Sequence, residues 1–256
     1  MQLGDFTKLA KEYINRPGYS TELLTMIGKY AGMDKEGFTV ADVGAGTGKL
    51  TEELTKIGLH GFAVEPNDAM RSEGMKLEEV SKSFKWSKGT AEETGLETDS
   101  VDWVLMGSSF HWADTKLALH EFHRILKRGG VFTAVYNPRD IEGHPLFEGI
   151  EQMIRDEVPG LKRVSSGSKS NVGDIEERLL STDCFDNLIF TETSFTVNMT
   201  KDRYMGAWRS VNDIQAQAGP ERFEKIMSNI EDMISSYDTI DVPYKCRAWT
   251  VRSTKR

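Results

Sequence analysis

The chain has 256 residues, 38% hydrophobic and 28% charged, which predicts a globular protein with a single domain over 1–256. Its formal net charge of −8 argues against a nucleic-acid partner, because binding to a phosphate backbone depends on clustered lysines and arginines. The sequence lacks a membrane-length apolar stretch and a secretory signal pattern, so we expect a cytoplasmic protein with no membrane partner.

The first half of the chain alternates between strand and helix patterns. Ser20 is a suitable N-cap for a first helix that ends at Gly32. Strands are then predicted at 38–43, 61–65, 101–106 and 131–136, with helices from 49, over 68–80 and over 114–127. Parallel strands need crossover connections, so this alternation predicts an α/β fold with a parallel sheet.

The second half changes rhythm after Asn137 and Pro138. Its predicted elements are helices at 144–157, 173–180 and 223–234 and strands at 185–197 and 244–251. We interpret 137–184 and 198–240 as insertions that form a helical cap over a substrate. The Ser/Gly-rich loop at 165–170 fits either a lid or a surface connection, and composition favours the surface connection.

A glycine turn carries the main functional signal. Gly44, Gly46 and Gly48 follow the strand that ends near Asp42, and they let the backbone turn sharply and approach a ligand. Glu65 ends the next strand, where a carboxylate reaches the hydroxyls of a ribose. Dinucleotide enzymes use Gly-x-Gly-x-x-Gly, whose third glycine is replaced here by Lys49, so the spacing favours S-adenosylmethionine.

Four segments together resemble class I S-adenosylmethionine-dependent methyltransferases, in particular small-molecule enzymes related to the ubiquinone/menaquinone and trans-aconitate methyltransferases, with a methyltransferase type 11 domain. The segments are Tyr13–Tyr19, Asp42–Gly48, Gly89–Glu92 with Asp99–Asp102, and Glu121–Gly130. The likeness covers about half of the chain. It implies a Rossmann-like, seven-stranded, mostly parallel sheet with helices on both faces, a helical cap, and a cofactor-binding core at 33–136.

The resemblance also implies a set of cofactor contacts. Asp42, Gly44, Gly46, Gly48 and Ser108 would surround the methionine part, Glu65 the ribose, and Met70, Thr90, Ala91 and Glu92 the adenine; Tyr13, Arg16 and Tyr19 would close the pocket. The chain departs from the family at Arg128, where a proline commonly stands, and at Thr90, where an aspartate is frequent. The second departure weakens the expected adenine contact.

The methyl acceptor is expected beyond the carboxyl ends of the later strands, where ligands collect in open α/β sheets. The candidates are His111, Trp112, Tyr136, Asn137, Arg139 and His144. His111 is the first choice for a catalytic base and His144 the second. Arg139 and Arg209 are candidates to pair with a carboxylate or phosphate, and Trp208 stands beside Arg209.

These observations predict methyl transfer from S-adenosylmethionine to a carboxyl, hydroxyl or amine of a small molecule by in-line displacement. Two alternatives stay open: a non-catalytic S-adenosylmethionine-binding regulatory protein and an NAD(P)-dependent oxidoreductase. We expect no metal, and a monomer or a homodimer. The identity of the acceptor cannot be read from the residues.

Overall fold

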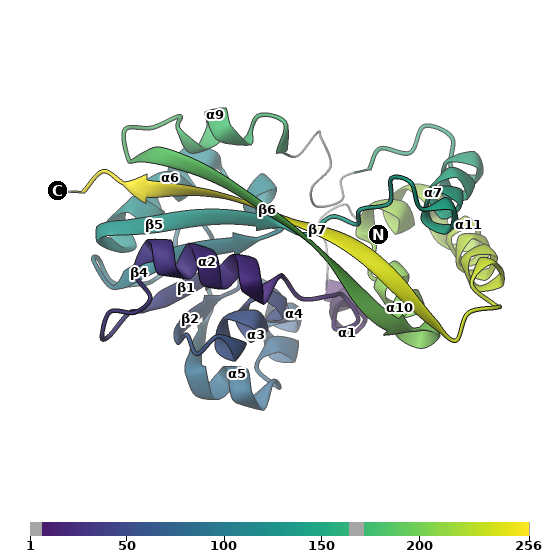
Figure 1. The fold of residues 1–256 in the computed structure, drawn as a ribbon, viewed down its shortest axis with the longest axis horizontal. Helices are drawn as coiled ribbons and strands as arrows, with labels where there is room; N and C mark the ends of the chain where they lie inside the picture. The colour runs from purple at the N-terminus through teal and green to yellow at the C-terminus, as the bar shows by residue number, and fades with distance from the viewer. Residues whose placement is uncertain (1–6, 164–171, 256) are drawn as a thin grey trace.

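A computed structural model of the protein describes residues 7–163 and 172–255, and the predicted loop at 165–170 lies outside them. Its centre is a seven-stranded sheet with the strand order β3-β2-β1-β4-β5-β7-β6 (Figure 1). The strands are β1 Val40–Val43, β2 Gly61–Val64, β3 Phe84–Ser87, β4 Val101–Gly107, β5 Leu126–Tyr136, β6 Phe185–Thr200 and β7 Thr239–Ser253. Among the strands of the described residues, β7 alone has the reversed direction, which confirms the mostly parallel sheet that the sequence predicts.

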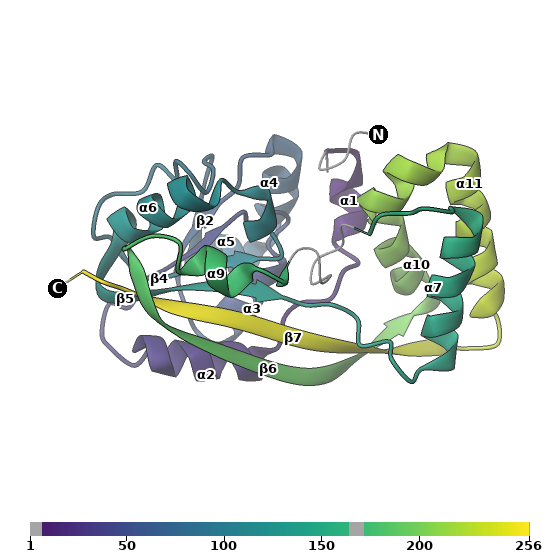
Figure 2. The same cartoon turned by 90° about the horizontal axis from the view of Figure 1, so that it is seen from above.

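Helices cover both faces of the sheet (Figure 2). One face carries α2 (Thr21–Ala31), α3 (Lys49–Lys56) and α5 (Glu78–Ser83), and the other carries α6 (Thr115–Ile125) and α9 (Ile175–Leu179). The Ser20 side chain accepts a hydrogen bond from the Leu23 amide at 3.2 Å, and Gly32 ends α2 with a φ of 94°, so both predicted caps are confirmed.

Two predictions of local structure need correction. The helix predicted over 68–80 is two helices, α4 (Asp68–Gly74) and α5, because the chain turns between Met75 and Leu77. Strand β3 was not predicted. This four-residue strand forms the edge of the sheet beside β2, and Phe84 is its only buried residue. Its hydrophobic pattern is therefore a weak signal in the sequence.

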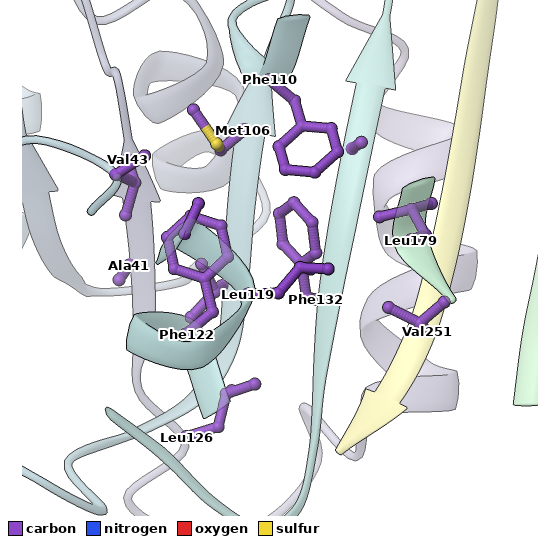
Figure 3. Packing of buried hydrophobic residues seen from close by; sticks show 14 of the residues in the cluster. Ala41, Val43, Met106, Phe110, Leu119, Phe122, Leu126, Phe132, Leu179 and Val251 are labelled. Carbon is purple, nitrogen blue, oxygen red and sulfur yellow. The ribbon is translucent and has the colours of Figure 1, made fainter. Parts of the chain in front are cut away.

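Separate hydrophobic cores lie on the two faces of the sheet. On the α6 face, Phe122 packs against Phe132 of β5 with ring centroids 4.7 Å apart, and Val251 of β7 adds to the same cluster (Figure 3). On the opposite face, Leu24 of α2 and Leu54 of α3 are fully buried against the strands. These cores hold the carboxyl ends of the parallel strands in fixed positions.

A helical cap stands beyond one end of the sheet and has a third core of its own. It contains α7 (Pro145–Glu157), α10 (Lys201–Arg209) and α11 (Asn212–Met233), with α1 (Ala10–Tyr13) packed against α10. Helix α11 is kinked at Gly219 and Pro220. By contrast, α9 packs against α6 and β7, so the range 137–184 that was predicted as a cap insertion divides between the cap and the sheet.

The long antiparallel pair of β6 and β7 carries the cap, and α10 and α11 connect the two strands. Pairing between β5 and β7 stops at Tyr136 and Arg247, whereas β6 and β7 stay paired as far as Thr200 and Thr239. The projecting half of β7 places Tyr244 in the core of the cap. Within 7–163 and 172–255, no helix combines the length and apolar character that crossing a membrane requires.

Candidate functional site

A cavity of about 670 Å³ lies between the cap and the carboxyl ends of the parallel strands. This volume falls within the range of about 300–1,000 Å³ that is usual for small-molecule sites. Residues from the glycine turn after β1, the ends of β2 and β4, the segment after β5, and the cap all line it. The location is where ligands are expected in an open α/β sheet.

The glycine turn forms one wall of this cavity. Gly44 and Gly46 line it with φ angles of 72° and 59°, a region that only glycine adopts without strain. A Cβ on Gly44 would lie 2.8 Å from the Ser109 hydroxyl oxygen. Gly48 does not line the cavity; it is the N-cap residue of α3, and a Cβ there would face Leu77 and Trp86.

Glu65 holds this turn in place. One carboxylate oxygen accepts a hydrogen bond from the Gly46 amide at 2.8 Å, and the other accepts one from the Asn67 amide at 2.7 Å. Burial raises the pKa of Glu65, and the two amide bonds and Arg71 work against that shift. Each oxygen keeps a further lone pair on the cavity wall, so the side chain can brace the turn and accept from a ligand.

Asp42 lies at the base of the same wall and is fully buried. Its Oδ2 accepts a hydrogen bond from the Thr51 hydroxyl at 2.6 Å, while Oδ1 has no hydrogen-bond partner among the described residues. Burial raises the pKa of Asp42 to about 7; the bond from Thr51 opposes the shift, and the nearby charge of Glu65 adds to it. Asp42 therefore offers an unsatisfied acceptor at the cavity wall.

The other predicted cofactor residues also line the cavity: Tyr13, Arg16, Tyr19, Met70, Thr90, Ala91, Glu92 and Ser108. The Tyr19 hydroxyl donates to Ser108 Oγ at 2.9 Å, and Arg16 donates through Nε to Ser210 Oγ at 2.7 Å. The N-terminal segment thereby links the end of β4 to the cap. Glu92 accepts from the Asp114 amide at 2.8 Å, so it also anchors the start of α6.

The predicted acceptor residues separate in the structure. His111, Trp112, Asn137 and Arg139 line the cavity. Tyr136 is completely buried beneath His111, with ring centroids 5.9 Å apart, and does not reach the cavity. His144 lies at the start of α7 on a second, smaller cavity of about 380 Å³. The structure thus does not bring His144 to His111.

His111 is chemically unusual among the lining residues. Burial lowers the pKa of His111 to about 4, and the charge of Arg178 adds to this effect. The imidazole is therefore neutral at physiological pH. Its Nδ1 is buried without a hydrogen-bond partner in the described residues, and its ring lies 4.9 Å from that of Trp112.

Several lining residues were not predicted from the sequence. They are Pro17, Thr47, Lys49, Leu50, Pro66, Asn67, Met106, Gly107, Ser109, Ala113, Pro138, Ile141, Glu151, Arg163, Ala207, Val211, Asn212, Asp213 and Tyr244. The lining residues from the cap belong to no sequence motif, because the packing of α7, α10 and α11 alone brings them to the cavity. Arg209 lies outside the cavity and pairs with Glu224 at 3.1 Å.

The strand order, the single reversed strand and the glycine turn define a Rossmann-like class I methyltransferase fold. A proposed type II methyltransferase from Anaeromyxobacter dehalogenans has a similar structure, with a TM-score of 0.68, 21% identity, and coverage of 93% of this chain and 97% of that one. Haemonchus contortus phosphoethanolamine N-methyltransferase 2, solved in complex with S-adenosyl-L-methionine, gives a TM-score of 0.53 at 16% identity, over 98% of this chain and 57% of that one. At sequence identities this low, structural similarity shows a shared fold and nothing further.

Sequence comparisons identify the core more closely. Residues 41–134 match the family model described as a methyltransferase domain. An uncharacterized methyltransferase of Mycobacterium tuberculosis is 38% identical over 125 residues, which is 49% of this chain and 48% of that protein. An uncharacterized methyltransferase of Schizosaccharomyces pombe is 29% identical over 153 residues, 58% of this chain and 57% of that protein. Residues 41–134 thus match a methyltransferase domain, and the chain spans about half the length of the curated relatives it matches.

Proposed function

We propose that this protein transfers a methyl group from S-adenosylmethionine to a small-molecule acceptor. The observation that carries the proposal is one continuous cavity, lined at one end by the glycine turn, Asp42 and Glu65 and at the other by the cap. A cofactor and an acceptor can meet in such a space. A protein that only binds S-adenosylmethionine for regulation would not need the end of the cavity that the cap lines.

The residues present fit the cofactor. Its methionine part carries an ammonium group, and the unpartnered Oδ1 of Asp42 is a suitable acceptor for it. The remaining lone pairs of Glu65 suit ribose hydroxyls. When bound, S-adenosylmethionine supplies a methyl group that is activated by the positive charge on its sulfur.

The chain itself contributes alignment and the exclusion of water. Tyr19 and Ser108 tie the N-terminal segment over the end of β4, and Asn137 donates to the Gly18 carbonyl at 2.8 Å from the other side. Holding two reactants in line within a dry pocket lowers the barrier by up to about 7–11 kcal/mol. The acceptor type, whether carboxyl, hydroxyl or amine, belongs to this proposal.

Titration of the full chain with S-adenosylhomocysteine, S-adenosylmethionine and NAD tests the proposal directly. We expect the first two to raise Tm, since a ligand at 100 times its Kd stabilises by about 2.7 kcal/mol, and we expect NAD to have no effect. Gly46→Val should abolish the shift, because the new side chain forces strain at a φ of 59° and enters the cavity. A Tm shift with NAD alone, or an unchanged response of Gly46→Val, contradicts the assignment.

A catalytic role for His111 is a separate part of the proposal. If His111 removes a proton from the acceptor, His111→Ala should lower kcat by about 100-fold or more and leave the Kd of S-adenosylhomocysteine unchanged. A pKa of about 4 makes the neutral imidazole a weak base, so a carboxylate acceptor, which needs no proton removal, fits it better. A variant with a raised KM and an unchanged kcat would identify His111 as a wall of the pocket.

A further inference from the structure

The cap end of the cavity is charged, unlike a simple apolar pocket. Arg139, Glu151, Arg163 and Asp213 all line it, and they come from the segment after β5, from α7, from the chain beyond α7, and from α11. None of them takes part in the glycine turn or contacts Glu65 in the structure. Their arrangement therefore bears on the acceptor and not on the cofactor.

Three of these four side chains, two carboxylates and one guanidinium, form a single ion-pair cluster. Arg163 donates through one terminal nitrogen to both oxygens of Glu151, at 2.9 and 2.7 Å, and through Nε to Asp213 at 3.1 Å. All three are largely shielded from solvent, which strengthens the pairing. Arg163 thus pairs with both carboxylates at once, and the cluster keeps one net negative charge.

Arg139 stands apart from this group. Its guanidinium carbon lies 3.8 Å from the ring centroid of Trp208, and no carboxylate of the described residues forms an ion pair with it. Trp208 is almost completely buried and does not line the cavity, so the indole supports Arg139 from behind. Arginine on an aromatic face keeps its planar hydrogen-bonding edge exposed to polar partners. Tyr244 takes one hydrogen bond from Arg139, and a guanidinium has five N–H donors, so others can reach a carboxylate.

Arg139 is charged in this setting. Burial tends to lower its pKa, but the neighbouring Tyr244, Tyr204 and Glu151 outweigh that effect and raise the pKa above its ordinary value. The net negative charge of the Glu151–Arg163–Asp213 cluster acts on this cation through space, but no carboxylate of the described residues forms an ion pair with it, so a ligand carboxylate can make charge-assisted hydrogen bonds there. A single guanidinium balances one negative charge, which suits a carboxylate better than a phosphate dianion.

We propose that Arg139, supported by Trp208, binds a carboxylate of the methyl acceptor at the cap end of the cavity. This inference rests on the proposed function and names its substrate class: small molecules that carry a carboxylate as a recognition group. The pairing with Arg139 withdraws negative charge from that carboxylate and makes it a weak nucleophile. The atom that receives the methyl group is therefore a different one, closer to His111 and the glycine turn.

Binding to the full chain saturated with S-adenosylhomocysteine tests this subsite without knowledge of the natural acceptor. The probes are succinate, glutarate and phenylacetate, each compared with its neutral amide, together with inorganic phosphate and 1,4-diaminobutane. We expect at least one carboxylate to raise Tm by about 2 °C or more at millimolar concentration, and the corresponding amide, phosphate and the diamine to have no effect. If no carboxylate binds, or if an amide, the diamine or phosphate binds equally well, the proposal is wrong.

Substitutions of Arg139 test whether this residue is the one that binds the carboxylate. Arg139→Gln should lose the response to carboxylates while keeping its affinity for S-adenosylhomocysteine, and Arg139→Lys should retain only part of the response because it lacks the planar fork. Arg209→Gln is the matched control, since Arg209 is partly exposed, pairs with Glu224 and lies outside the cavity. An undiminished carboxylate response in Arg139→Gln would overturn the proposal. Failure of the wild type to bind S-adenosylhomocysteine would instead contradict the proposed function.

Discussion

Asp42 shows how one buried side chain links cofactor binding to pH. Its carboxyl has a pKa of about 7 in the folded protein because burial disfavours the charged form. In the unfolded chain the ordinary pKa of an aspartate is about 3.9. Between these values the folded state holds a proton that the unfolded state has lost, so the stability of the ligand-free protein should fall as pH rises from about 4 to 7.

The opposite dependence is expected for cofactor affinity. The ammonium of S-adenosylhomocysteine favours ionised Asp42, so affinity should rise as pH increases through about 7, approaching tenfold per pH unit well below the pKa, and binding should release a proton. Calorimetry between pH 5.5 and 8.5, in buffers of different ionisation enthalpy, measures both effects. Asp42→Asn should bind more weakly and lose the proton release. Glu65 also faces the ligand with a raised pKa, so a retained pH dependence in this variant would assign it to Glu65.

At the scale of elements, close contact between β1 and β2 positions the two ends that form the cofactor wall. Gly61 begins β2 opposite Val40, with a φ of 154°. A Cβ on Gly61 would overlap the backbone carbonyl oxygen of Val40, which cannot move without breaking the pairing of the strands. The glycine is therefore required for register between the strands that carry Asp42 and Glu65.

We expect Gly61→Ala to lower the free energy of unfolding by about 3 kcal/mol or more, because it combines backbone overlap with strain. Gly58→Ala is the matched control: Gly58 also has a positive φ, of 80°, but nothing lies within 4 Å of its would-be Cβ, so the cost should be only about 1 kcal/mol. Urea unfolding of both variants measures the difference. Equal urea midpoints for the two variants would show that the contact with Val40 is not the reason why glycine is needed at position 61.

At the scale of the whole molecule, the cap and the sheet have separate hydrophobic cores, which the paired strands β6 and β7 and the N-terminal segment join. Ile154 of α7 lies entirely within the cap core and is fully buried. The two parts should therefore respond differently to loss of packing. The cap lines one end of the cavity, and the carboxyl ends of the strands line the other.

Ile154→Ala should destabilise the cap by about 2–5 kcal/mol through the cavity it leaves. Hydrogen exchange should accelerate in α7 and α11, while the amides of β1 and β4 stay protected and the Kd of S-adenosylhomocysteine changes less than about threefold. Leu119→Ala, in the core between α6 and the sheet, is the comparison and should accelerate exchange across the strands. Uniform acceleration in both variants would show that cap and sheet unfold as one unit.

Much of the cofactor end was predictable because its signals are local. The strand before Asp42, the glycine spacing and the position of Glu65 lie within 25 residues of one another, and strand–turn–helix geometry alone brings them together. The sequence could not show that Gly48 caps α3 instead of facing the cavity. It also could not show that Glu65 hydrogen-bonds the Gly46 amide.

The sequence by itself determined the fold class, the positions of β1, β2, β4 and β5 along the chain, and the glycine turn with Asp42 and Glu65. Tertiary structure alone decided the acceptor end. Tyr136 and Asn137 are adjacent, yet one is buried under His111 and the other lines the cavity, since neighbouring side chains at a strand end point in different directions. The support of Arg139 by Trp208 and the pairing of Arg163 with Asp213 each join residues 50 or more positions apart. Packing of the cap helices on the paired strands β6 and β7 creates these contacts, and no local pattern encodes them.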